Sequence, residues 1–452
     1  MNILVLNGSP KGEDSITLQT VRYWEKKFHQ HFEVLHVGRK IKALEKNFAP
    51  ALEAIAKADL LLFSYPVYTF IAPCQLHKFI ELMKTHKAEV AGKIATQLTT
   101  SKHFYDVTAH RYVQDNVQEM GMHYIGGLSA DMEDLTTEKG RKEADSFWKH
   151  LNWAVENKIY EPYYPIPAPT APVPVTVPEE AFAGKPKDVV IIADLQREDT
   201  QLAGMISRFR TKLPYGTRVV NLREYPFNGG CLGCFSCAIT GKCVHKDGFD
   251  EFLRTRIQTA DAMIYAFPIR DHSMGALFKT YDDRQFCNGH RTVTIGMPVG
   301  YLINGNLSKE ENLRTIMEGR AQVGSNIYTG AATDEFDTDA EIDRLVANLS
   351  YALENKNTGP QNFYGIGGMK IFRDLIWQMQ GFMRADHKFF KSHGQYDFPQ
   401  KQWPKMLALY AVGAMLSNPK LKSKMGNAMN EGMLMPYNKV LEQVRTRQAA
   451  QK

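Results

Sequence analysis

Four of the six cysteines in this 452-residue chain lie within thirteen positions. They are Cys231, Cys234, Cys237 and Cys243 in the segment CLGCFSCAITGKC, with the spacing C-x2-C-x2-C-x5-C. The sequence begins MNILVLNGSP, without the basic start and long apolar run of a secretory signal, so we expect a cytoplasmic, reducing location. Clustered thiols in such a compartment are typical of metal ligands rather than disulfides.

The cysteine spacing also narrows the kind of metal group. Short successive turns can wrap four thiolates around a cuboidal [4Fe–4S] cluster, and Gly230, Gly233 and Gly241 give the loop the flexibility to do so. A structural zinc site more often uses two cysteine pairs on separate turns. Zinc, a redox-active dithiol and a loop without metal are the alternatives. Cys74 and Cys287 stand apart in the sequence and are expected to be buried core thiols.

A second constellation is the segment NGSPKGEDSIT at residues 7–17, directly after the apolar run ILVLN. Its glycines allow the backbone to approach a ligand, and the free N–H groups of the helix that follows attract an anion. A phosphomonoester suits that geometry, and the segment is neither a Walker loop nor the dinucleotide motif G-x-G-x-x-G. A plain strand-to-helix turn is the alternative, and Glu13 and Asp14 oppose an anion unless they point outward. The hydroxyl side chains are those of Ser9, Ser15 and Thr17.

Two further strand ends complete the outline of a ligand. In SYPVYTFIAP, Pro66 restricts the backbone and Tyr68 offers a ring on which a planar ligand could stack. Thr99, Thr100 and Ser101 provide small polar groups for the edge of a heterocycle. A phosphate cradle, an aromatic wall and a polar edge on successive strand ends together indicate flavin mononucleotide (FMN).

The elements that position these residues form a pattern that occurs twice. Both halves alternate buried apolar strands with helical stretches, and the segments starting at Lys57 and Thr259 read alike: Ala-Asp, strand, aromatic-Pro, loop, helix. Such βα units predict doubly wound parallel sheets that bind ligands beyond the carboxyl ends of their strands. The expected strands are 3–7, 32–37, 59–66 and 94–100 in the first half, and 189–194, 217–222, 261–268 and 292–298 in the second.

The proline-rich stretch 162–178 separates the halves and predicts a semi-rigid linker. The predicted domains are therefore 1–160 with FMN, a linker at 161–187, 188–358 with the four-cysteine loop, and a helical extension at 359–452. We expect this extension to pack on the second domain; a role at a partner or membrane surface is the alternative.

The composition limits the possible partners. Hydrophobic residues make up 44% and charged residues 23%, as in ordinary globular proteins, and the net charge is +6. The sequence has no block of basic residues with interleaved aromatics, so we do not expect nucleic acid as a partner. The apolar stretch 406–416 is too short to span a membrane.

The first half, over about residues 1–135, resembles the flavodoxin-like NAD(P)H-dependent FMN reductase and quinone reductase superfamily. The resemblance rests on the NGSP loop with Ser15 and Thr17, and on the P-V-Y loop with Gln75-Leu76 and Phe79-Ile80 behind it. It implies that the FMN phosphate is held by Ser9, Lys11, Ser15 and Thr17. It further implies that the isoalloxazine is lined by Pro66, Val67, Tyr68 and Thr69, with Thr99, Thr100 and Ser101 along its other edge.

The second half resembles the same superfamily, and more narrowly the iron–sulfur flavoproteins, which carry a compact cysteine motif after the second strand. It departs from the family at the flavin site, where ADLQREDTQL replaces the NGSP-like loop and Arg270 stands opposite Tyr68. We therefore expect one FMN per chain, in the first half. The family's K…DR ending is kept in Lys279, Asp283 and Arg284.

The sequence thus predicts two tandem flavodoxin-like doubly wound domains with a helical extension, arranged as a pseudo-dimer within the chain and open to homo-oligomerisation. The expected function is a flavin-dependent oxidoreductase that passes electrons between NAD(P)H, or an electron carrier, and a small acceptor or redox protein through FMN and a [4Fe–4S] cluster. The alternatives are an FMN or quinone reductase without a metal cluster, and a non-enzymatic electron carrier. The residues single out no catalytic side chain.

Overall fold

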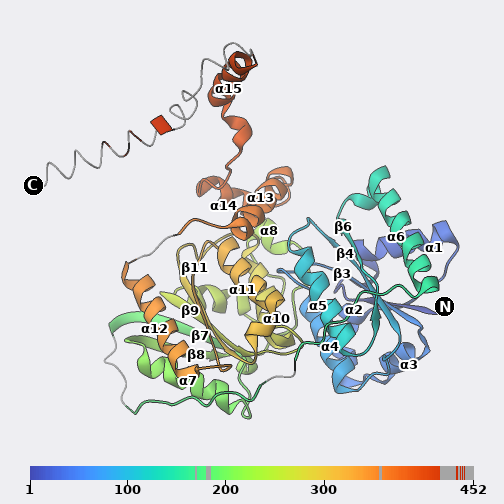
Figure 1. Ribbon diagram of the computed structural model, residues 1–452, viewed down its shortest axis with the longest axis horizontal. Helices are drawn as coiled ribbons and strands as arrows, with labels where there is room; N and C mark the ends of the chain where they lie inside the picture. The colour runs from blue at the N-terminus through green and yellow to red at the C-terminus, as the bar shows by residue number, and fades with distance from the viewer. Residues whose placement is uncertain are drawn as a thin grey trace, which may run out of the picture. The chain divides into compact units, whose positions relative to one another are not determined.

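A computed structural model describes residues 1–167, 170–179, 185–355 and 359–417, together with 434–435, 438, 440 and 442. The chain divides into two compact units, Met1–His393 and Gly394–Lys452. The first unit contains two separate parallel sheets, each surrounded by helices (Figure 1).

The first sheet is built from apolar runs whose side chains alternate between its two faces. Its strand order is β2-β1-β3-β4-β5, with β6 paired to β4, and every pairing is parallel. Leu4 and Leu6 pack on one face and Val5 packs on the other. The strands are β1 (Ile3–Asn7), β2 (Glu33–Leu35), β3 (Leu60–Pro66), β4 (Ile94–Ser101), β5 (His123–Tyr124) and β6 (Leu128–Asp131).

Helices cover both faces of this sheet. On the face of Val5, Trp24 and Trp148 stack with their ring centroids 5.6 Å apart. These tryptophans come from α1 (Ile16–Phe28) and α6 (Glu138–Asn157). The opposite face is covered by α2 (Val37–Lys46), α3 (Ala49–Lys57), α4 (Cys74–Thr85) and α5 (Asp106–Glu119).

The second sheet repeats the same topology, with the order β8-β7-β9-β10-β11 and parallel pairings throughout. Its strands are β7 (Lys185–Ala193), β8 (Tyr215–Asn221), β9 (Ala262–Pro268), β10 (Pro298–Asn304) and β11 (Ile327–Thr333). One face packs on α7 (Thr200–Lys212) and α12 (Thr338–Asn355), and the other on α10 (Gly275–Arg284) and α11 (Glu311–Val323). Short helices α8 (Ser236–Thr240) and α9 (Phe249–Phe252) follow β8.

The predicted fourth strand of the second half is wrong. The segment 292–298 ends where β10 begins, and residues 293–296 form a turn. Val293 and Ile295 are exposed there, and Gly296 has a φ of 75°, which interrupts an extended chain. The β-branched alternation of TVTI imitates a strand, whereas the side chains that enter the core come later, from Val299 onward.

The repeated order confirms the predicted fold class of two flavodoxin-like α/β domains followed by helices. The later helices are α13 (Phe363–Gln378), α14 (Arg384–Ser392) and α15 (Trp403–Leu416). The first two belong to the larger unit and α15 to the smaller one. Of the predicted helical extension, residues 418–433 and most later positions lie outside the described residues.

The proline-rich segment lies along the second half. The described residues of 161–179 form no helix or strand, and 168–169 and 180–184 lie outside the described residues. The Val173 backbone N–H donates to the Asp334 carbonyl at 2.8 Å, and the Val173 carbonyl accepts from Gln201 and Thr338 at 2.6 and 2.7 Å. The strand β7 begins at Lys185, inside the predicted linker.

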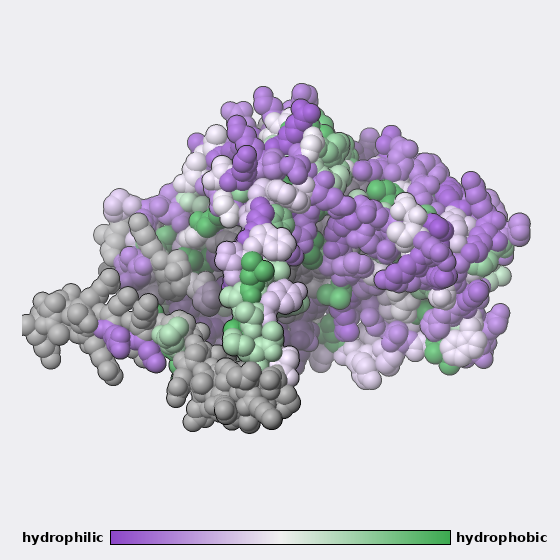
Figure 2. Space-filling model, turned by 90° about the horizontal axis from the view of Figure 1, so that it is seen from above, coloured by the Kyte–Doolittle hydropathy of each residue, from purple (hydrophilic) through white to green (hydrophobic). Residues whose placement is uncertain are grey.

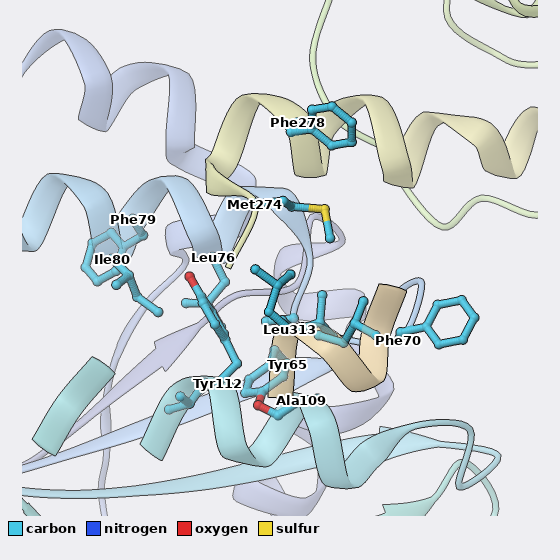
Figure 3. Packing of buried hydrophobic residues seen from close by; sticks show 14 of the residues in the cluster. Tyr65, Phe70, Leu76, Phe79, Ile80, Ala109, Tyr112, Met274, Phe278 and Leu313 are labelled. Carbon is cyan, nitrogen blue, oxygen red and sulfur yellow. The ribbon is translucent and has the colours of Figure 1, made fainter. Parts of the chain in front are cut away.

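The two halves share one hydrophobic core. Leu76 and Tyr112 from the first half lie in the same buried cluster as Met274, Phe278 and Leu313 from the second. Figure 3 shows these side chains converging between the helices of both halves. Because the apolar side chains are continuous, each half buries surface that it would expose alone.

The surface contrasts with this core. The face seen in Figure 2 is mainly hydrophilic, with small hydrophobic patches between charged and polar residues. Among the described residues, no helix combines the length and the apolar character that crossing a membrane requires.

Candidate functional site

Hydrogen bonds within the loop after β1 fix the conformation of its backbone. Asn7 donates from Nδ2 to the Gly12 carbonyl at 2.8 Å, and its Oδ1 accepts from the Ser9 backbone N–H at 3.1 Å. Gly12 has a φ of 61°, which favours glycine. Ser15 occupies the N-cap of α1, but its hydroxyl caps no backbone N–H of that helix. The first-turn N–H groups therefore have no side-chain cap and can receive an anion.

The acidic residues of this loop point away from the site. Glu13 pairs with Arg22 and with His36, both at 2.9 Å, and its side chain is mostly exposed. The hydrogen bond from Arg22 lowers the pKa of Glu13. Asp14 is also exposed. Neither carboxylate lines the cavity that Ser9, Lys11 and Ser15 line. Their negative charges therefore do not oppose an anion bound in that cavity.

One cavity, partly open to solvent, is lined by most of the predicted flavin residues. Thr99 is the exception, because strand residues alternate in direction and its hydroxyl instead lies 2.8 Å from His110 Nε2. The predicted residues that line the cavity are Ser9, Lys11, Ser15, Thr17, Pro66, Val67, Tyr68, Thr69, Thr100 and Ser101.

The four-cysteine loop lines the same cavity. Cys231, Cys234, Cys237 and Cys243 all face it, although they come from the other half of the chain. The loop touches the predicted flavin residues directly: Gly233 has a φ of 60°, and a Cβ there would collide with the Tyr68 hydroxyl. Lys11 Nζ lies 5.7 Å from the centroid of the Phe235 ring. The Cys231 carbonyl accepts from Gln75 Nε2 at 3.1 Å.

The helix α10 contacts both loops through buried charges. Lys279 pairs with Asp283 at 2.6 Å and donates to the Tyr68 carbonyl at 2.9 Å, and its side chain is fully buried. Asp283 accepts from the Thr69 hydroxyl at 3.0 Å and from the Cys74 backbone N–H at 2.8 Å. The K…DR ending therefore fixes the Tyr68 loop of the first half.

The next residue of α10 fixes the cysteine loop. Arg284 pairs with Asp247 at 2.7 Å and donates to the Gly229 carbonyl at 2.8 Å, two residues before the first cysteine of the loop. Lys42 of the first half donates to the Asn228 carbonyl at 2.6 Å. The start of the cysteine loop is thus held from both halves.

The thiols are chemically suited to a metal but are not gathered around one point. None of the six cysteines forms a disulfide. Among the described residues, no group of three or more His, Cys, Asp or Glu side chains is arranged to hold a metal ion. Burial raises the pKa of the Cys231 and Cys237 thiols, the latter to about 11. A metal group bound here must displace those protons.

The remaining cysteines behave as expected. Cys74 and Cys287 are both buried, at 3% and 2% exposure. Burial raises the pKa of both thiols, that of Cys287 to about 12.

Sequence reasoning missed a second wall of the cavity. His290 lines it, and its ring nitrogen Nδ1 lies 2.9 Å from the Asp386 carboxylate of α14. Ile371, Phe372 and Leu375 of α13 also line it. The helices α13 and α14, at the start of the predicted extension, thus contribute to this wall. Gly289, the residue before His290, has a φ of 61°, and a Cβ there would collide with Asp386.

The corresponding loop of the second half is occupied by its own side chains. Asp194 pairs with Arg223 at 2.7 Å, and Asp199 pairs with Arg270 at 3.5 Å. The Asp199 carboxylate also accepts from the Gln196 backbone N–H at 2.8 Å. These charged groups pair with one another, whereas the first half has hydroxyls and a lysine that face a cavity.

Comparison with known proteins identifies relatives of the first half. Residues 1–133 match the family of NADPH-dependent FMN reductases. The first half is a domain of this flavodoxin-like flavin reductase superfamily. The resemblance predicted from the NGSP and P-V-Y loops is confirmed, and the enzyme class of the matched domain is a flavin oxidoreductase.

The chain is also similar to individual proteins. An iron–sulfur flavoprotein of Archaeoglobus fulgidus is 28% identical over 173 residues, covering 36% of this chain and 78% of that protein. An iron–sulfur flavoprotein of Clostridioides difficile is 33% identical over 54 residues, covering 12% of this chain and 24% of that protein. Among solved structures, the apo form of an NADH:FMN oxidoreductase is 20% identical with a TM-score of 0.30, covering 34% of this chain and 89% of that one.

Proposed function

We propose that the chain is an NAD(P)H-dependent flavin oxidoreductase with one FMN in its first half and a [4Fe–4S] cluster in the loop 231–243. The observation that carries the proposal is that the four cysteines line the same cavity as the predicted flavin residues other than Thr99. FMN supplies two-electron and one-electron chemistry, and the protein supplies binding, orientation and exclusion of water.

The residues of the first loop fit an FMN phosphate. Lys11 supplies a positive charge, the buried hydroxyls of Ser9, Ser15 and Thr17 supply hydrogen bonds, and the α1 N-terminus supplies free N–H groups. Tyr68 is half-buried against Phe286, with ring centroids 6.1 Å apart in an edge-to-face arrangement. Burial raises the pKa of Tyr68 well above its usual value, so the ring stays neutral and can stack on a flavin.

The contact between the halves supports a division of labour. The cysteine loop of the second half lies against the predicted flavin loop of the first, at Gly233 and Tyr68. In a dimer of single domains, one subunit would place its loop against the other subunit's flavin in the same way. We therefore interpret the chain as a fused pseudo-dimer, in which the second half has exchanged its phosphate site for the ion pairs of Asp194 and Asp199.

A reductase without a metal cluster is the second candidate. It is favoured by the arrangement of the thiols, which would have to turn toward a common point to bind a cluster. The two similar proteins described as iron–sulfur flavoproteins favour the cluster instead. A third candidate, an electron carrier without turnover, is separated from both by the reaction with NAD(P)H.

The deciding experiment is anaerobic purification of the full chain, followed by analysis of FMN, iron, sulfide and zinc. We expect one FMN and about four irons per chain, the content of one [4Fe–4S] cluster. Cys234→Ser should lose most of the iron and keep FMN, whereas the buried control Cys74→Ala should keep both.

Stopped-flow measurements then follow the reduction of FMN by NAD(P)H and its reoxidation. The Cys234→Ser variant should be reduced normally and reoxidised more slowly. Protein that carries zinc or no iron would contradict the cluster, and iron with unchanged reoxidation in the variant would make the cluster structural. Bound FMN that NAD(P)H does not reduce would leave the carrier as the function.

A further inference from the structure

The helix α15 lacks the polar face that a surface helix ordinarily has. Its fourteen residues favour a helix, because Pro404 lies in the first turn and leucine, methionine and alanine are strong helix formers. Lys405 is the only charged residue among them. A helix on the surface of a globular protein usually has one charged or polar side, whereas a helix that is apolar on all sides is usually buried.

The side chains of α15 are nevertheless exposed. Every residue from 403 to 415 is exposed except Met406, which is half-buried. No residue of this range belongs to the buried hydrophobic clusters of the described residues. At 3.6 residues per turn, the large exposed side chains are spread around the whole helix axis. They are Trp403, Leu407, Leu409, Tyr410, Val412 and Met415, with Trp403 64% and Tyr410 75% exposed. An apolar surface of this kind indicates a binding partner.

The charges along this part of the chain have one sign. Residues 398–430 contain five lysines and no aspartate, glutamate or arginine. This segment therefore holds nearly all of the positive excess of a chain whose net charge is +6. Lys401 and Lys405 are exposed at the start of α15, and the other three lysines lie outside the described residues and are counted from the sequence alone. The five are Lys401, Lys405, Lys420, Lys422 and Lys424.

The length and the charge of the segment together indicate the partner. A helix of fourteen residues is about 21 Å long, shorter than the roughly 30 Å hydrocarbon core of a bilayer. Apolar helices of this length are typical of protein cores or of membrane interfaces, and the exposure of α15 excludes the first. A second copy of the chain would bring two lysine-rich segments together with no acidic residue between them. An anionic lipid surface supplies both negative charge and an apolar interior.

We propose that α15 inserts into the surface of a membrane that contains anionic phospholipids. Its apolar side chains enter the boundary between headgroups and acyl chains, where tryptophan and tyrosine are favoured, and the lysines on either side contact lipid phosphates. The inference does not rest on the proposed function, because no residue of α15 lines the cavity of the predicted flavin site. It assigns an interaction surface to a part of the chain outside the family match at residues 1–133.

The test uses the full chain and two kinds of vesicle in a flotation assay. One kind is phosphatidylcholine alone, and the other contains about one third phosphatidylglycerol, so that only the second attracts lysine side chains. We expect binding to the anionic vesicles to be at least about tenfold tighter. Raising the salt concentration from about 0.1 to about 0.5 M should weaken that binding, because salt screens exposed charges.

One variant removes the apolar character of the helix at exposed positions. Leu407→Glu combined with Tyr410→Glu places two carboxylates where side chains should enter the lipid, and binding to anionic vesicles should fall by more than about tenfold. Phe336→Glu is the matched control, since Phe336 is 69% exposed in the loop after β11. This control should bind as the wild type does. Circular dichroism and urea midpoints should be the same in all three proteins, because exposed substitutions rarely change stability.

A second variant tests the charges alone. Replacing Lys401 and Lys405 by glutamine should weaken binding to anionic vesicles by about fivefold for each lysine, the usual contribution of a lysine near such a surface. Binding to phosphatidylcholine vesicles should not change. Equal effects on both kinds of vesicle would mean that these lysines do not contact the lipid headgroups.

Trp403 distinguishes insertion from adsorption by charge. Lipids with brominated acyl chains quench only those indole rings that enter the bilayer, and Trp24 and Trp148 are buried in the first half. We expect anionic vesicles made with such lipids to quench the tryptophan fluorescence of the wild type. Trp403→Phe should lose most of this quenching while it still floats with the vesicles.

Three outcomes overturn the inference. The wild type does not bind anionic vesicles, or it binds them as tightly as the variant with Leu407→Glu and Tyr410→Glu does, which would assign the binding to lysines elsewhere. In the third outcome, the wild type forms dimers in light scattering, this variant is monomeric, and neither binds vesicles, so that a second copy of the chain covers α15.

Discussion

The loops after β1 and β7 occupy the same place in two copies of one fold, but their side chains differ. Side chains after β1 face a cavity, whereas those after β7 form ion pairs with arginines. After β1, the Asn7 side chain forms a hydrogen bond with the backbone of its own loop, and Ser15 and Lys11 face a cavity. After β7, Asp194 and Asp199 pair with Arg223 and Arg270. Asp199 occupies the N-cap of α7 as Ser15 occupies that of α1. A topology that brings a loop to the ligand edge thus does not make a site, because the charges of the loop decide what can enter.

The largest expected effect comes from making the first loop resemble the second. Ser15→Asp places a carboxylate where we expect the FMN phosphate, and like charges in contact cost several kcal/mol. FMN affinity should fall more than about a hundredfold, as measured by fluorescence titration. The control Ser15→Ala removes one neutral hydrogen bond and should cost only about 1 kcal/mol. Equal affinity in wild type and Ser15→Asp would show that the phosphate lies elsewhere.

The second prediction concerns the buried charges of α10. Lys279→Ala leaves Asp283 buried without its cation and should destabilise the chain by about 3 kcal/mol in urea unfolding. Lys78 of α4 makes an i,i+3 pair with Glu81 at the surface, and Lys78→Ala should cost less than about 0.5 kcal/mol. Similar losses in the two variants would mean that the contact between the halves does not depend on Lys279.

Tyr68 and Arg270 are counterparts in the two halves and give a smaller effect. Each exchanges backbone hydrogen bonds with the residue three positions later, Ile71 and Ser273 respectively. Tyr68→Ala should weaken FMN by roughly 1 kcal/mol and change its fluorescence, because a stacked ring is lost. Arg270→Ala should leave FMN affinity unchanged. If Arg270→Ala weakened FMN as much as Tyr68→Ala, the second half would contribute to flavin binding.

The last prediction is a pH dependence of stability at the contact between the halves. His272 lies 3.0 Å from Glu310 and 3.5 Å from Glu119 of α5, and although burial opposes the charge, these carboxylates raise its pKa to about 9. Because the folded pKa is raised, this contribution to stability is complete below pH 6.5 and is lost as the pH rises through 9.

Urea midpoints measured from pH 6 to 10 should therefore fall less steeply in His272→Gln than in the wild type. His110 gives the opposite case, since burial lowers its pKa to about 4 and its contribution is lost as the pH falls from 6.5 through 4. His110→Gln should flatten the acid side instead. Identical alkaline slopes in wild type and His272→Gln would exclude this histidine as the source.

The parts of the site that sequence could predict are those carried by local pattern. Apolar runs predict the strands and therefore where each strand ends. The NGSP loop and the P-V-Y loop follow two of these strand ends. Thr99 was predicted beside its neighbours but points away, because adjacent residues of a strand face opposite sides. The segment 292–298 has the alternation of a strand, and only the backbone at Gly296 shows that it turns. Hydrophobic periodicity predicts the strands of the sheet, but it does not predict toward which side the polar residues at a strand end point.

The sequence by itself determined the two α/β halves, the cysteine loop, and the difference in charge between the loop that follows the first strand of one half and the loop that follows the first strand of the other. These features depend on residues close together in the chain, where spacing and residue type limit the geometry. Tertiary structure alone decided that the cysteines of the second half line the same cavity as the predicted flavin residues of the first, and that Asp386 contacts His290. Those contacts join residues separated by about a hundred positions or more, and no local pattern encodes them. They arise because the two halves bury one continuous hydrophobic core, and its packing sets which distant polar groups meet.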